Sequence, residues 1–151
     1  MLKALIFDLD GTLAHTLPAI AEGMNLALAE LGYPEISEAQ VYEFINMGAR
    51  DYAKYALPAK YREDDARVDA LYAAYNRHYA EVYMHTDTTY DGIPALIEHL
   101  KGKYPLAVNS NKQDEFVKKI TEALYPGEFE LVMGQSAFPT KPAPDAPLYI
   151  A

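Results

Sequence analysis

Two aspartates that are two positions apart, Asp8 and Asp10, are the residues in this sequence best suited to chemistry. They follow the apolar residues 5–7 and precede Gly11, a pattern that predicts a buried strand ending in a turn. Side chains two positions apart in a strand face the same side, so the two carboxylates converge while the backbone stays extended. The alternative is a simple turn with two solvated carboxylates. The carboxyl end of a buried parallel strand is the usual place for an α/β active site, and this position favours chemistry.

Further polar groups follow two later apolar runs. Ser110 and Asn111 come after residues 106–109, just before a predicted helix. A serine placed there offers its hydroxyl and nearby backbone N–H groups to a phosphate oxygen, although helix capping explains such a serine about as well. Lys141 lies beside Pro142, after the run 129–133. A stiff backbone suits an ammonium that must neutralise both an anionic nucleophile and a phosphoryl group, whereas a lone lysine is otherwise surface charge.

The elements that must position these groups predict an α/β fold. Strands at 5–7, 106–109 and 129–133 alternate with helices near 93–100 and 115–124, and this alternation indicates a parallel sheet with right-handed crossovers. Residues 15–85 carry apolar residues at helical spacing and predict an all-helical insert. We therefore expect a Rossmann-like core of three layers, formed by residues 1–14 and 86–151, with residues 15–85 as a helical cap. Asp145 is best explained as the start of a further helix.

Composition narrows the partners. The chain has 151 residues, half of them hydrophobic, and a formal net charge of −9, which argues against nucleic acid or an anionic membrane surface. It has no cysteine, so no disulfide or thiolate metal site is expected. The N-terminal residues do not have the pattern of a signal peptide, and no apolar stretch is long enough to span a bilayer. The expectation is a cytoplasmic protein, and a small phosphorylated substrate would need only local positive charge.

Three motifs in order, Asp8-Leu-Asp10-Gly-Thr, the strand ending at Ser110, and Lys141-Pro-Ala-Pro, resemble those of the haloacid dehalogenase-like superfamily. Members of that superfamily are mostly magnesium-dependent phosphatases and phosphomutases. The resemblance covers nearly the whole chain and is greatest to phosphoglycolate phosphatase-like and β-phosphoglucomutase-like proteins, whose cap is inserted at this point. Two departures stand out. His15-Thr16 replaces the usual Asp-Ser, and the sequence ends before the fourth, acidic motif, which predicts a C-terminally truncated member with an incomplete sheet.

The resemblance implies phosphate-ester hydrolysis through an aspartyl-phosphate. Asp8 is the implied nucleophile, and Asp10 is the acid and base. Ser110, Asn111 and Lys141 would balance the phosphoryl oxygens. The implied cofactor is Mg²⁺, held by the Asp8 carboxylate and the Asp10 backbone carbonyl.

Substrate contacts are the least specific part of the resemblance. Arg50 in the cap is a candidate for pairing with a carboxylate or phosphate of the leaving group, but a surface ion pair explains it equally well. Lys112 resembles a residue found in phosphoglycolate phosphatase-like members, and a solvated lysine is the alternative. A small, 2-phosphoglycolate-like monoester is the expected substrate.

Two other functions stay open at this point. A β-phosphoglucomutase-like phosphomutase uses the same two aspartates and transfers the phosphoryl group to a second hydroxyl. A truncated, inactive chain that acts only by binding is also compatible with the missing fourth motif. In either case the strand before Asp8 would form an open sheet edge, so we expect a monomer or a dimer that self-associates through this edge.

Overall fold

The structure is a computed structural model that describes residues 3–85, 88–135 and 138–151. The chain divides into two compact units, one formed by Met1–His15 with Thr88–Ala151 and the other by Thr16–Asp87. The expected return to the core at residue 86 lies outside the described residues. We call the first the sheet unit and the second the helical unit, and describe each by itself.

The sheet unit contains a three-stranded parallel sheet in the order β1–β4–β5. Its strands are β1 (Leu5–Phe7), β4 (Leu106–Gln113) and β5 (Leu131–Gln135). In the register, Leu5 lies opposite Leu106, and Val108 lies opposite both Phe7 and Val132. Consecutive strands are linked by helices, as a parallel sheet requires. The carboxyl ends of β1 and β4 therefore meet at one edge of the sheet.

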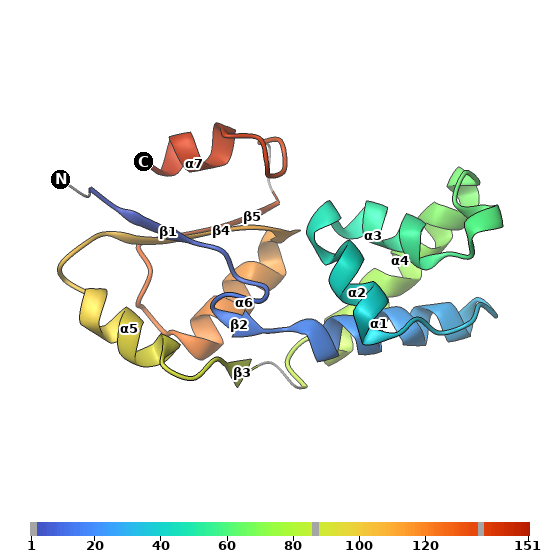
Figure 1. Ribbon diagram of the computed structural model, residues 1–151, viewed down its shortest axis with the longest axis horizontal. Helices are drawn as coiled ribbons and strands as arrows, with labels where there is room; N and C mark the ends of the chain where they lie inside the picture. The colour runs from blue at the N-terminus through green and yellow to red at the C-terminus, as the bar shows by residue number, and fades with distance from the viewer. Residues whose placement is uncertain (1–2, 86–87, 136–137) are drawn as a thin grey trace. The chain divides into compact units, whose positions relative to one another are not determined.

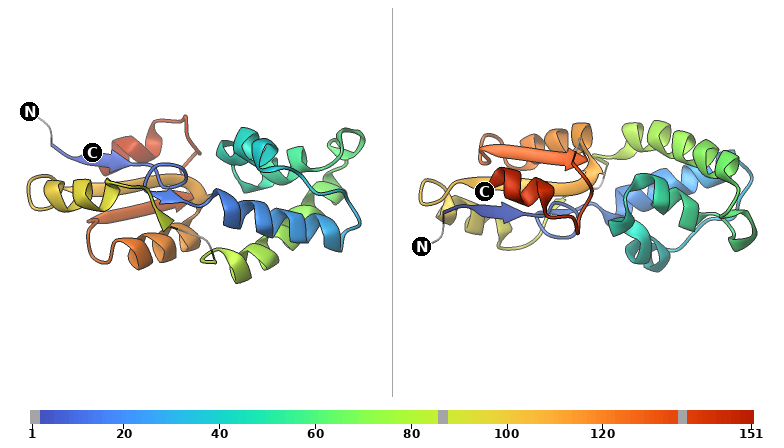
Figure 2. Two further views of the ribbon diagram at one scale, coloured as in Figure 1. Left: turned by 60° about the horizontal axis from the view of Figure 1, so that its bottom comes forward. Right: turned by 90° about the horizontal axis from the view of Figure 1, so that it is seen from above.

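Helices cover both faces of this sheet. Figure 1 shows α5 (Ile93–Leu100) and α6 (Asp114–Leu124) on one face and the short α7 (Asp145–Ile150) on the other, and Figure 2 shows α7 lying across the strands. Ile97, Val117 and Ile120 bury their side chains almost completely. The predicted α/β class with three layers is confirmed, and α7 begins at Asp145, as predicted.

Strand β4 differs from its prediction, because it extends beyond Asn109 to Gln113. Its regular pairing with β5 stops at Asn109, opposite Met133, and resumes at Gln113, opposite Gln135. The residues between them form an irregularity of the kind that often re-aims side chains at functional sites. Ser110 and Asn111 thus lie in a distorted strand segment, and not in a turn after a finished strand.

The helical unit consists of four α-helices and two short 3-10 helices within the described residues. These are α1 (Leu17–Glu30), α2 (Glu38–Phe44), η1 (Ile45–Met47), α3 (Ala49–Ala56), η2 (Ala59–Tyr61) and α4 (Asp65–Val82). The Ser37 hydroxyl accepts a hydrogen bond from the Gln40 backbone N–H, and the Ser37 backbone N–H donates to the Gln40 side chain. This capping box explains why α2 begins directly after Ser37.

The core of the helical unit lies between α1 and α4. Leu28, Leu71 and Tyr79 are buried there. At Gly23 the two helices approach so closely that an added Cβ would lie 3.2 Å from the Tyr79 Cα atom. Tyr79 stacks on Tyr75, which is also buried, so these two tyrosines are part of the core of the helical unit.

A two-stranded antiparallel ribbon was not predicted. β2 (Ala14–His15) pairs with β3 (Thr88–Thr89), next to the points where the chain leaves and re-enters the sheet unit. His15 Nδ1 lies 3.1 Å from the Tyr90 hydroxyl, so the unusual His15 belongs to this ribbon. Two-residue strands show no hydrophobic alternation, which is why the sequence pattern missed them. None of the described helices has the length and apolarity needed to cross a membrane.

Candidate active site

The two aspartates lie on the loop that follows β1. Leu9 between them lies in a turn and is fully buried, whereas Asp8 and Asp10 are both partly exposed. The backbone N–H groups of Thr12, Leu13 and Ala14 all donate to the carbonyl oxygen of Leu9. This loop is further fixed by the Tyr125 hydroxyl, which donates to the Leu13 carbonyl oxygen at 2.6 Å. Burial raises the pKa of that hydroxyl.

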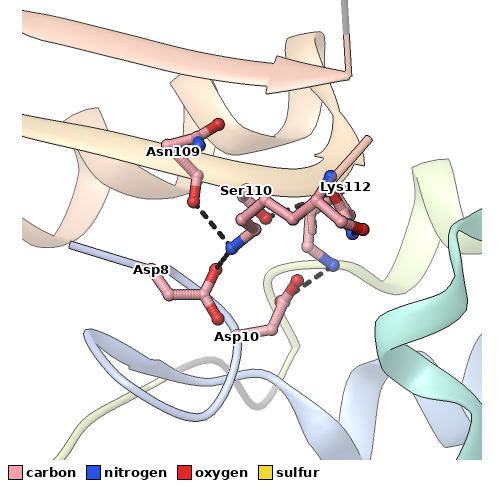
Figure 3. A network of polar contacts seen from close by, with 7 residues as sticks. Asp8, Asp10, Asn109, Ser110 and Lys112 are labelled. Carbon is pink, nitrogen blue, oxygen red and sulfur yellow. Dashed lines mark hydrogen bonds and ion pairs between the residues drawn. The ribbon is translucent and has the colours of Figure 1, made fainter. Parts of the chain in front are cut away.

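Lys141 joins the loop after β5 to the loop after β1. Its Nζ atom donates to Asp8 Oδ1 at 2.7 Å and to the Asn109 carbonyl oxygen at 2.9 Å. In Figure 3 dashed lines join this ammonium to the Asp8 carboxylate and to the Asn109 carbonyl oxygen within β4. The Asp8 and Lys141 side chains keep 34% and 31% of their surface exposed, so an anionic ligand has access to both.

Lys112 makes a second ion pair, with Asp10. Its Nζ atom lies 3.0 Å from Asp10 Oδ1, and the two side chains are only 7% and 11% exposed. The backbone N–H of Lys112 donates to Ser110 Oγ at 3.2 Å, which leaves the hydroxyl proton of this buried serine for another acceptor. Figure 3 shows both contacts near the Asp8 and Asp10 carboxylates.

The Asn111 side chain holds the backbone of Lys141 at two points. Asn111 Oδ1 accepts from the Lys141 N–H at 2.7 Å, and Asn111 Nδ2 donates to the Lys141 carbonyl oxygen at 3.1 Å. These contacts and the Asn109 carbonyl were missed by the sequence analysis. A backbone carbonyl has no residue signature, and the partner of an asparagine amide depends on folding.

The structure therefore brings six of the predicted residues into one network. They are Asp8, Asp10, Ser110, Asn111, Lys112 and Lys141. Arg50 belongs to the helical unit, where its guanidinium pairs with Asp65 and Asp69 at 3.0 and 2.9 Å. Hydrogen bonds from Arg50 to these two carboxylates raise the pKa of its guanidinium.

The donor atoms of this network fit a magnesium ion. Mg²⁺ in proteins is held by one or two carboxylates, with waters and substrate phosphates completing its shell. Asp8 and Asp10 supply hard oxygen donors, although the described residues contain no cluster of three or more His, Cys, Asp or Glu side chains arranged to hold a metal. The formal charges of two aspartates and two lysines cancel, so a phosphate dianion entering this network would need added positive charge.

The sequence of the chain is similar to known proteins over nearly its whole length. Residues 5–150 match the family model described as haloacid dehalogenase-like hydrolase. The chain is 36% identical over 146 residues to the phosphoglycolate phosphatase of Aquifex aeolicus (strain VF5), which covers 95% of this chain and 66% of that protein. The phosphoglycolate phosphatase of Rhodospirillum rubrum is 34% identical over 156 residues, or 98% of this chain and 64% of that protein. The chain thus spans about two thirds of the length of these curated relatives.

A solved structure shows the same fold. The crystal structure of a predicted phosphoglycolate phosphatase from Haemophilus somnus 129PT matches with a TM-score of 0.86 at 30% identity, covering 98% of this chain and 69% of that one. The likeness extends over the parallel sheet and the helical insertion together.

Proposed function

Because the chain belongs to the haloacid dehalogenase-like hydrolases, we propose that it is a phosphatase of small phosphate monoesters that works through an aspartyl-phosphate on Asp8. The observation that carries the proposal is the 2.7 Å contact between Asp8 and Lys141. It pairs an exposed carboxylate with a cation at the strand ends where Asp10 and Ser110 also lie. An ammonium in this place attracts a phosphoryl group to the nucleophile.

In the first half of the reaction, an Asp8 carboxylate oxygen attacks phosphorus and the ester P–O bond breaks. Asp10 gives its proton to the leaving alkoxide, which departs as an alcohol. Lys141, Ser110 and the backbone N–H of Asn111 stabilise the phosphoryl oxygens. In the second half, Asp10 takes a proton from water, the resulting hydroxide attacks phosphorus, and inorganic phosphate leaves with Asp8 regenerated.

Magnesium is the cofactor that this site would hold, with the Asp8 carboxylate and the Asp10 backbone carbonyl as its protein ligands. When bound, Mg²⁺ supplies the positive charge that the balanced aspartates and lysines lack for a phosphate dianion. With the ion bound, the Asp8 side chain would remain the nucleophile, and the Asp10 side chain would remain the acid and base.

For the substrate we propose 2-phosphoglycolate or a monoester of similar size. The support is the likeness to relatives named phosphoglycolate phosphatase, at up to 36% identity. Lys112, whose ammonium lies beside Asp10, is the proposed contact for the substrate carboxylate. Removing this cation should raise KM for 2-phosphoglycolate more than KM for an aryl phosphate, whose aryl group carries no carboxylate.

The covalent intermediate provides the test of this mechanism. The Asp10→Ala variant, mixed with 2-phosphoglycolate and Mg²⁺, should show no steady-state turnover and should at most gain the mass of one trapped phosphoryl group, because Asp10 serves both half-reactions. The matched control is Asp8→Asn, which lacks the nucleophile and should gain no mass. A phosphoryl adduct on the Asp8→Asn variant, or ordinary turnover by Asp10→Ala, would refute these assignments. Transfer to a second sugar hydroxyl in place of water would instead identify a phosphomutase.

A further inference from the structure

We propose that Asn111 is a positioning residue, whose side-chain amide fixes the backbone of Lys141 so that the lysine ammonium stays on Asp8. The inference rests on the proposed phosphoryl transfer at Asp8, and it assigns to Asn111 a role separate from any phosphate contact of its backbone. The amide carries both a donor and an acceptor, and both are used on one residue, at 3.1 and 2.7 Å.

Lys141 needs such a support because its own segment has no regular structure to hold it. It lies between the end of β5 at Gln135 and the start of α7 at Asp145, outside any described helix or strand. Its side chain has four flexible methylene groups, so a mobile backbone would leave the position of its Nζ atom poorly defined. The hydrogen bonds from Asn111 fix both polar groups of the Lys141 backbone at once.

These two hydrogen bonds between Asn111 and Lys141, which we call the clamp, also fix the distance between two parts of the site. Asn111 directly follows Ser110 in β4, so the hydroxyl proposed for the phosphoryl group and the amide that holds Lys141 belong to one rigid dipeptide. The Asn109 carbonyl, one residue earlier, accepts from the Lys141 ammonium. Three consecutive residues of β4 therefore specify where the Lys141 cation and the Ser110 hydroxyl lie relative to each other.

The chain contains a matched control for this clamp. In the helical unit, Asn25 Oδ1 accepts from the Ile36 N–H at 2.9 Å, and Asn25 Nδ2 donates to the Ile36 carbonyl oxygen at 3.0 Å. Asn25→Leu and Asn111→Leu thus each remove one such pair of hydrogen bonds, and both introduce a side chain of the same size. A purely structural role predicts the same kind of effect from both variants.

We expect Asn111→Leu to lower kcat by about 10- to 100-fold, the usual effect of a catalytic group misplaced by an ångström, with KM nearly unchanged. Asn25→Leu should leave kcat unchanged. In a Lys141→Ala background Asn111→Leu should have little further effect on kcat, because the residue it positions is already gone. Equal losses of kcat from Asn111→Leu with and without Lys141 would overturn the proposal.

Backbone amide hydrogen exchange gives a readout that needs no activity. Exchange of the Lys141 N–H should be faster in Asn111→Leu than in the wild type and unchanged in Asn25→Leu. If the wild type hydrolyses no phosphate monoester, the proposed function fails, and unchanged exchange at Lys141 would separately overturn the clamp. Should Asn111→Leu not fold, Asn111→Ala removes the same two hydrogen bonds without added bulk or charge. That variant should show a comparable loss of kcat, and wild-type kcat would count against the clamp.

Discussion

At the scale of single residues, the spacing of Asp8 and Asp10 contained most of the information that the sequence held about the site. Leu9 between them is fully buried and both aspartates are partly exposed, as the prediction requires, although Leu9 lies in a turn and not in the extended strand. Lys141 was expected to neutralise the nucleophile, and it pairs with Asp8 from 133 positions away. The pairing of Lys112 with Asp10 was beyond the sequence, because it forms only when β4 lies beside the loop after β1. The same holds for Asn111, whose amide meets Lys141 only after the loops fold together.

The ion pair of Lys112 with Asp10 leads to a prediction on stability. Both side chains are nearly buried, so Lys112→Met removes the cation that faces the buried Asp10 carboxylate and should lower the free energy of unfolding by about 3 kcal/mol. Adding Asp10→Asn to this variant should restore most of the loss. The control is Lys119→Met, since Lys119 pairs with Glu115 at the surface, and it should cost less than about 0.5 kcal/mol in urea denaturation. A loss for Lys112→Met as small as that of the control would contradict the prediction.

At the scale of elements, the sequence predicted the strands and long helices well, because each has a clear hydrophobic period. It placed the end of β4 four residues too early, at Asn109 instead of Gln113, since the polar residues 110–113 have no apolar alternation. These polar residues stay in the strand because β5 resumes pairing at Gln113 and α6 begins directly afterwards. The irregular segment that carries the site thus depends on the tertiary neighbours of β4.

Gly134 in β5 is required by this close packing. A Cβ atom there would lie 2.5 Å from the Asp114 Cα atom and 2.6 Å from the Lys112 carbonyl oxygen. We therefore expect Gly134→Ala to lower the free energy of unfolding by about 2–3 kcal/mol, since backbone must shift. Gly23→Ala is the comparison and should lose less stability. Its Cβ contact of 3.2 Å is looser, and alanine stabilises a helix relative to glycine by about 1 kcal/mol. Equal unfolding midpoints for Gly134→Ala and wild type would contradict this view.

Asp114, at the start of α6, makes the contact between α6 and Gly134 of β5 sensitive to pH. Burial raises the pKa of its carboxyl, but hydrogen bonds from Lys118 and from the Gly134 N–H outweigh this, and the pKa falls below its ordinary value of 3.8. Because the pKa of this carboxyl is lower in the folded than in the unfolded chain, the carboxylate stabilises the fold at pH values above its unfolded pKa. That contribution disappears as the pH falls through the folded pKa. The stability difference between wild type and Asp114→Asn should therefore shrink below about pH 4. A difference that stays constant from pH 7 to pH 3 would rule this out.

At the scale of the whole molecule, the sheet leaves β1 with one neighbour among the described strands. It pairs with β4 on one side only, and Ile6 at its centre is 38% exposed. The Leu5 N–H points toward β4, where it donates to the Pro105 carbonyl oxygen, so the neighbouring Ile6 N–H points the other way. Such an edge offers backbone groups and apolar surface to a further strand.

We expect this chain to self-associate through the β1 edge in a concentration-dependent way. Ile6→Lys should shift the chain toward the monomer, because a charged side chain opposes pairing at a sheet edge. Leu131→Lys is the matched control, as Leu131 is 36% exposed on β5, the strand at the other edge. Light scattering after size-exclusion chromatography gives the mass of each variant. A wild type that is monomeric at all concentrations, or an equal effect of both variants, would exclude the β1 edge.

The central claim is that Asp8, with Lys141 beside it, is the nucleophile of a magnesium-dependent phosphatase. The most direct measurement is phosphate release from 2-phosphoglycolate by the wild type and by Asp8→Asn, each with Mg²⁺ and with a chelator. We predict turnover only for the wild type with Mg²⁺, since the variant lacks the attacking oxygen and chelation removes the charge that a phosphate dianion needs. Turnover that persists in Asp8→Asn, or no turnover by a wild-type chain shown to be folded and loaded with Mg²⁺, would contradict the claim.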